Sequence, residues 1–76
     1  MNFPMIGDLA VLVHQVKPYQ IHGDQYYQLI VTRIGDASNE AGAIAVPQHA
    51  IALPPQAGDR LTVNFLMGQV TSAKPL

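Results

Sequence analysis

The sequence predicts one small all-β domain, and two features of the chain carry this prediction. Glycine and proline recur so often that the uninterrupted stretches run to roughly ten residues, too short for long helices. Between these breaks lie runs rich in Val, Ile, Leu, Thr and Tyr, which suit a pleated, half-buried surface. With 76 residues there is room for one domain only, so we expect residues 1–76 to form it.

The clearest predicted strand spans Arg60 to Met67. Apolar and polar residues alternate there with the period of two that buries one face of a strand. The apolar set is Leu61, Val63, Phe65 and Met67. Gly68 follows directly, and it predicts either a tight turn into a strand over residues 69–73 or a kink in one long bent strand.

Two further strands are predicted over residues 8–16 and 25–34, the second being the longest candidate. In the first run both faces are nearly equally apolar, with Val16 grouped beside Ala10 and Leu12, so we expect burial on both sides. The segment between them, residues 17–24, is too long for a two-residue hairpin. We therefore expect an extended, twisted hairpin with turn chemistry at Gly23-Asp24.

The middle of the chain predicts less regular structure. Residues 35–41 are polar and predict a loop, and residues 42–46 predict a short strand that Pro47 ends. Residues 47–53 fit either one short helical turn opened by Pro47 or an irregular edge, and Pro54-Pro55 ends the segment in both cases.

This order of elements resembles the OB-fold over nearly the whole chain. The resemblance lies in five strands, an aromatic first hairpin, and a connector between the third and fourth strands where that fold usually places a helix. It implies a small five-stranded barrel, whose closure would remove the exposed edges of so apolar a sheet. An SH3-like barrel fits the same lengths almost as well, and both alternatives stay open.

Composition restricts the functions to consider. Four basic and five acidic residues give a net charge of −1, so no basic field attracts phosphates from a distance. The chain has no cysteine, signal-like segment or long apolar run, and we expect a soluble cytoplasmic protein without membrane contact. So few charges with 49% hydrophobic residues favour association, so a homo-oligomer is expected.

Neither catalysis nor metal binding is predicted. His14, His22 and His49 do not stand at ligating intervals, and no cofactor motif is present. The serines and threonines and the single glutamate show no nucleophile-elbow, phosphate-loop or zincin spacing. We therefore expect a non-enzymatic binding module with no metal and no cofactor.

The most informative residues are aromatic. Tyr19, Tyr26 and Tyr27 cluster around the first hairpin, with Lys17 and Arg33 near them in sequence. Aromatic rings beside cations can stack bases and follow a nucleic-acid backbone, and in OB-folds this region belongs to the binding face. Lys17, Tyr19, Tyr26 and Arg33 are the expected contacts to single-stranded nucleic acid, whereas Tyr27 shares a face with apolar residues and is expected in the core.

A second hypothesis assigns the chain to protein interaction or self-assembly without nucleic acid. It is motivated by the low charge and high apolar content of the chain. Residues 1–5 and Leu66-Met67 would then form the contact surface, because Met and Phe are favoured at interfaces.

Overall fold

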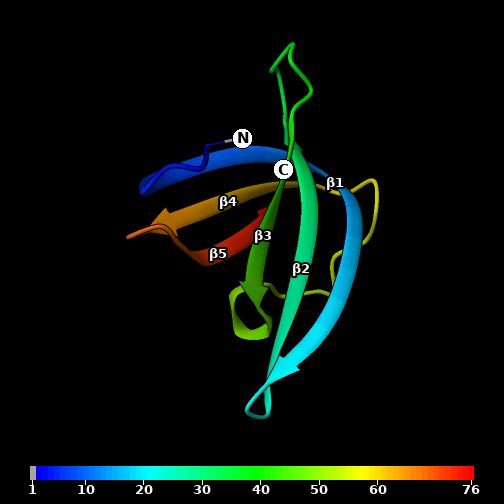
Figure 1. Cartoon of the computed structure of the whole chain (residues 1–76), viewed down its shortest axis with the longest axis vertical. Helices are drawn as coiled ribbons and strands as arrows, with labels where there is room; N and C mark the ends of the chain where they lie inside the picture. Colours follow the sequence, from blue (N-terminus) through cyan, green and yellow to red (C-terminus); the bar gives the residue numbers. More distant parts are fainter. Residues whose placement is uncertain (1) are drawn as a thin grey trace.

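A computed structural model describes residues 2–76, and these form five antiparallel strands in one sheet (Figure 1). The strands follow the sheet order β3-β2-β1-β4-β5. Their bounds are β1 Ile6–Ile21, β2 Asp24–Arg33, β3 Ala41–Pro47, β4 Arg60–Leu66 and β5 Gln69–Pro75. The predicted all-β class and the five strands are confirmed, although β1 and not β2 is the longest.

The strand β1 holds the sheet together because it pairs with two neighbours. Its first half pairs with β4 from Ile6 to Leu12, and its longer second part pairs with β2 from Val11 to Ile21. One extra residue, His14, interrupts the ladder with β2 and forms a β-bulge. The bulge shifts the alternation by one residue, so Val13 and Val16 both face the core although they are three residues apart.

This bulge corrects the prediction that β1 is buried on both faces. Val16 belongs to the core side, while Ala10 and Leu12 are half-buried on the opposite side of the sheet. The backbone of Val13 is held by the loop before β4, because its N–H donates to the carbonyl of Asp59 and its carbonyl accepts from the N–H of Gly58.

The predicted extended hairpin is confirmed, since β1 and β2 pair as far as Ile21 and Asp24, but its turn is shorter than expected and lies one residue earlier. A two-residue turn, His22-Gly23, joins β1 to β2, with φ of 51° and 84°. Both values are positive, as in the type I′ turns whose twist matches that of paired strands. Pro18 is compatible with a strand here because its backbone nitrogen points away from β2, and pairing with β4 has already ended at Leu12.

The second hairpin resolves the alternatives left open at Gly68. Met67 and Gly68 form a tight turn with φ of 52° and 76°, and β5 begins at the next residue. The predicted strand over residues 60–67 is confirmed except for its last residue, which lies in the turn.

Between β3 and β4 the chain forms a single short 3-10 helix, Gln48–Ala50. The helical alternative for residues 47–53 is therefore confirmed over three of them. Pro47 ends β3 at a position whose backbone points away from β2, as expected for an edge strand. Within residues 2–76 no helix is long enough to span a membrane.

The sheet does not close into the predicted barrel. The edge strands β3 and β5 run in the same direction and approach to within 8 Å between Cα atoms, and they lie close together in Figure 1. No ladder of hydrogen bonds joins them in the part of the chain that the structure describes. Ala73 of β5 instead forms a single parallel bridge with Ile51, which follows the 3-10 helix.

The core lies inside the curve of the sheet and is built from alternate residues of all five strands. No polar or charged residue of the described chain is buried. Phe3 extends the core from the N-terminal side, where its ring stacks on Phe65 with centroids 5.8 Å apart. The buried set is Val11, Val13, Leu29, Val31, Ile44, Val46, Leu61, Val63, Phe65, Val70 and Ala73.

Leu29 is the largest fully buried side chain, at 0% exposure, so its truncation tests this core. We expect Leu29→Ala to lower the free energy of unfolding by about 2–5 kcal/mol, because it removes buried methyl groups and leaves a cavity. Urea unfolding followed by circular dichroism measures the loss. Leu53→Ala is the matched control, since Leu53 is 73% exposed and its truncation should change stability by less than about 0.5 kcal/mol. Equal losses in both variants would contradict this core.

The polar loop predicted over residues 35–41 contains an ordered carboxylate. Asp36 accepts two hydrogen bonds at 3.0 Å, from the backbone N–H and from the hydroxyl of Ser38. These two bonds lower the pKa of Asp36, and the bond from the backbone N–H has the larger effect. The positive charge of Arg33 adds a smaller lowering. A lowered pKa means that the carboxylate stabilises the loop above the unfolded-state pKa, and that this contribution is lost as the pH falls through the folded-state pKa.

We expect Ser38→Ala to return the pKa of Asp36 part of the way towards its ordinary value, because the hydroxyl donor is lost and the backbone donor remains. Titration of the carboxyl carbon by NMR measures the change. Ser72→Ala, on β5, should leave the pKa of Asp36 where it is. A fall in that pKa on Ser38→Ala would show that the bond assignment is wrong.

Candidate binding surface

The aromatic residues of the first hairpin form one ordered pair on the outer face, the side of the sheet away from the core. Tyr19 and Tyr26 lie directly opposite each other on β1 and β2. Their rings stack with centroids 5.4 Å apart and an angle of 19° between planes. Tyr27 points to the other face and packs against the core, as its alternation predicted.

The stack has two consequences for ligand binding. Each ring is half-buried and uses one of its faces on its neighbour, so a ligand can stack only on the two remaining outer faces. In return, each ring holds the other in a fixed orientation, which lowers the entropy lost when a ligand binds.

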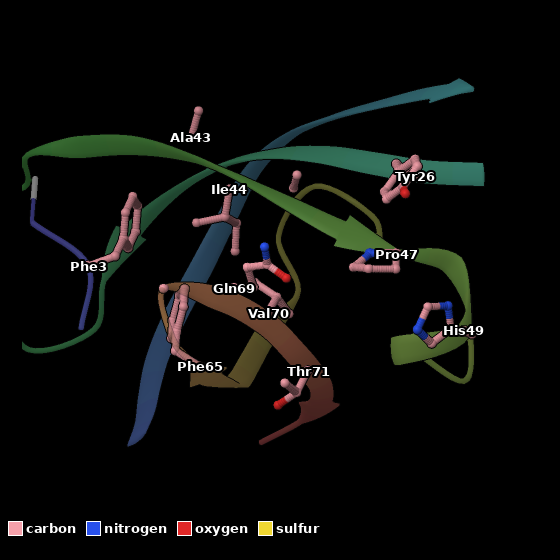
Figure 2. Close-up of a pocket in the computed structure, with 12 residues that line it drawn as sticks. Phe3, Tyr26, Ala43, Ile44, Pro47, His49, Phe65, Gln69, Val70 and Thr71 are labelled. Atoms are coloured by element: carbon pink, nitrogen blue, oxygen red, sulfur yellow. The ribbon is translucent and has the colours of Figure 1, made fainter. Parts of the chain in front are cut away.

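Two clefts meet beside Tyr26. The smaller, about 320 Å³, begins at the hairpin turn and runs between Gly23 and the 3-10 helix. The larger, about 720 Å³, continues along β3 to Gly68 at the turn between β4 and β5 (Figure 2). Tyr26, Pro47 and His49 line both, so the clefts form one path from the first hairpin to the second.

The side chains along this path are mainly neutral. Gln25 and Gln48 border the smaller cleft, and Gln69 and Thr71 border the larger one. Amide and hydroxyl groups both donate and accept hydrogen bonds, so this lining can contact polar groups of a ligand without a charge partner. Asp24 is the charged residue at the hairpin end of the path.

Of the expected site residues, Lys17, Tyr19 and Tyr26 are brought together. Lys17 is exposed and lies opposite Gln28, on the same outer face and two residues before Tyr19. Its ammonium can therefore neutralise an anionic group held beside the stacked rings.

Arg33 lies elsewhere. It is seven residues beyond Tyr26 along β2, a separation of about 23 Å at strand spacing. Its guanidinium donates a 3.1 Å hydrogen bond to the carbonyl of Asn2. In this structure Arg33 therefore fastens the N-terminal segment to the end of β2, away from the aromatic pair.

The remaining basic residues are also distant from the pair. Arg60 and Lys74 stand on β4 and β5, opposite Leu12 and Thr62. Of the four cations of the chain, Lys17 alone accompanies the tyrosines, while Arg60 and Lys74 lie on the neighbouring strands β4 and β5.

The three histidines occupy separate positions. His14 sits in the β-bulge, with Nε2 2.8 Å from the hydroxyl of Thr32, while His22 is in the hairpin turn and His49 in the 3-10 helix. Residues 2–76 contain no group of three or more His, Cys, Asp and Glu side chains placed to hold a metal ion.

The contribution of β3 and the 3-10 helix to this surface could not be identified from the sequence. Pro47, Gln48 and His49 follow one another in a segment whose conformation was ambiguous, and they meet Tyr26 only through the pairing of β3 with β2. The one available signal was the glutamines near the aromatic residues, which indicate a binding surface but not its partner.

Comparisons of the chain with protein-family models, with curated proteins and with solved structures find no match in any of the three.

Proposed function

We propose that the chain is a small, non-enzymatic binding module of OB-like architecture that binds single-stranded nucleic acid across β2 and β3. The observation that carries the proposal is the stacked Tyr19–Tyr26 pair beside the path formed by the two clefts. Stacking on aromatic side chains is a common way to hold an unpaired base, and it tolerates any base sequence.

The OB-like part of the proposal is supported by how the strands are arranged. A ladder between β3 and β5 would turn the sheet into a five-stranded barrel, and these two strands already lie side by side in the required order. OB-folds are partly open barrels that bind oligonucleotides on the face of strands 2 and 3, between the loops that follow strands 1 and 4. The path runs from Gly23 past the start of β2 and along β3 to Gly68, so it connects the corresponding two loops of this chain and borders that region.

In the proposed complex, bases stack on the free faces of Tyr19 and Tyr26. The glutamine side chains bordering the clefts contact base edges or sugars, and Lys17 contacts one phosphate group. Arg33 takes no part, because it lies far along β2 and is bonded to Asn2. Asp24 repels phosphate at the hairpin end, so the backbone of the ligand should pass on the side of Lys17.

Fluorescence anisotropy with a labelled oligothymidylate of about twelve nucleotides tests the stacking. We expect Tyr26→Leu to weaken binding by about tenfold, since stacking contributes about 1–3 kcal/mol per base and Leu keeps the apolar contact with the sheet. Leu53→Ala, at a residue that lines neither cleft, should bind as the unmodified protein does. No binding by the unmodified protein at tens of micromolar and low salt would rule out the proposal.

Because Lys17 is the one cation beside the tyrosines, we also expect the binding constant to depend only weakly on salt concentration. With Lys17 alone neutralising phosphate, the logarithm of the binding constant should fall with the logarithm of salt concentration with a slope of about −0.7. Lys17→Gln should flatten this slope, and Lys74→Gln on β5 should leave it unchanged. A slope several times steeper in the unmodified protein would show that the ligand contacts other cations.

A further inference from the structure

Four exposed apolar side chains gather at the turn between β4 and β5, away from the tyrosine pair. Ile6 and Leu66 are paired across β1 and β4, and Met67 occupies the turn itself. Met5 joins them because its carbonyl accepts a 2.8 Å hydrogen bond from the N–H of Gly68. We call these residues, Met5, Ile6, Leu66 and Met67, the apolar tip.

The four side chains of the apolar tip are largely exposed to solvent, although all of them are apolar. The exposed fractions are 68% for Met5, 70% for Ile6, 51% for Leu66 and 78% for Met67. Together these residues expose on the order of 500 Å², within the range of the largest apolar patch on a typical monomer, and such patches are often functional. A patch of this size points to a surface that another molecule covers.

The backbone supports the same conclusion. Met67 has a φ of 52°, in the left-handed region that disfavours residues with a side chain and is best tolerated by Gly, Asn and Asp. Its side chain is almost fully exposed, so it does not contribute core packing that would offset the strain. The two-residue turn itself requires this φ, as it does at His22 in the first hairpin, but Asn would fit the turn better than an exposed methionine, so the choice of methionine is not explained by the turn.

Contacts with β2, β4 and the second turn hold the N-terminal segment, residues 2–5, in place beside the apolar tip. Three contacts hold it, from Arg33 to Asn2, from Phe3 to Phe65, and from Gly68 to Met5. A Cβ at Gly68 would lie 3.4 Å from the sulfur of Met5, so that side chain already packs closely against the turn. These contacts bring Met5 beside Met67, although the two are far apart in sequence.

Charge and area indicate the occupant. The tip residues and the residues paired with them in register are all uncharged. The nearest acid along β1 is Asp8, which accepts a 2.7 Å hydrogen bond from Asn64. Because the tip carries no cation, it does not attract an anionic lipid surface. A net charge of −1 opposes contact between two copies only weakly.

We propose that the apolar tip is the contact surface of a weak homodimer, in which the tips of two copies pack on each other about a twofold axis. Such an interface uses the same patch twice, and flexible methionine side chains adapt to one another. About 500 Å² from each copy totals about 1,000 Å², the lower limit for a specific interface. An interface of this size is typical of a weak, transient complex, so the dimer should form only at high protein concentration. Met1, which the second hypothesis also assigned to this surface, lies outside the described residues.

Sedimentation equilibrium between about 10 µM and about 1 mM tests the proposal. The unmodified protein should pass from monomer to dimer over this range. Met67→Asn should raise the dissociation constant at least tenfold and also raise the midpoint of urea unfolding, because Asn-Gly is favoured in this turn. Weaker association together with greater stability would not result from a merely structural defect.

The matched control is Leu53→Asn, since Leu53 is 73% exposed but lies outside the tip. It should leave the dissociation constant unchanged. A protein that stays monomeric at the highest concentration overturns the proposal, whether or not it binds neutral phosphatidylcholine vesicles. Disruption by Leu53→Asn with no effect of Met67→Asn also overturns it. Met67 does not line the clefts, so oligonucleotide binding by Met67→Asn is measured separately and keeps the two proposals distinguishable.

Discussion

The β-bulge at His14 is the local constraint on which the arrangement of the molecule depends. The side chains of a strand alternate with a period of two, so one extra residue exchanges every later side chain between the faces. Before the bulge, Val11 and Val13 face the core, and after it Val16 does. The same exchange places Lys17 and Tyr19 on the outer face, opposite the core, where Tyr19 stacks on Tyr26.

The bulge is held by backbone contacts rather than by its own side chain alone. Both backbone groups of Val13 bond to the loop at residues 58 and 59, so the contacts of β1 continue past Arg60, the first residue of β4, into the loop before it. The side chain of His14 turns outward to Thr32. The bulge at His14 therefore lies between two features: Val13 before it bonds to the loop preceding β4, and the residues after it form the first hairpin.

The two hairpins use the same turn geometry for different surfaces. In each, a non-glycine residue with positive φ precedes a glycine. The first hairpin presents His22 and leads to the tyrosine pair, and the second presents Met67 within an apolar patch. A cleft borders Gly23 and another borders Gly68, so the path beside Tyr26 runs between the two turns.

The sequence by itself determined the all-β class, the strand at residues 60–66 and the core position of Tyr27, because hydrophobic alternation and strand-forming residues act locally. It did not determine the bulge, since Val16 fits either face until the pairing with β2 is known. Nearness in sequence placed Arg33 with the tyrosines, whereas the extension of β2 separates it from Tyr26. The clefts and the apolar tip depend on contacts between segments distant in sequence, such as Tyr26 with Pro47 and Met5 with Gly68. Only the tertiary structure decides these, because register and hairpin geometry determine which faces and ends of the strands meet.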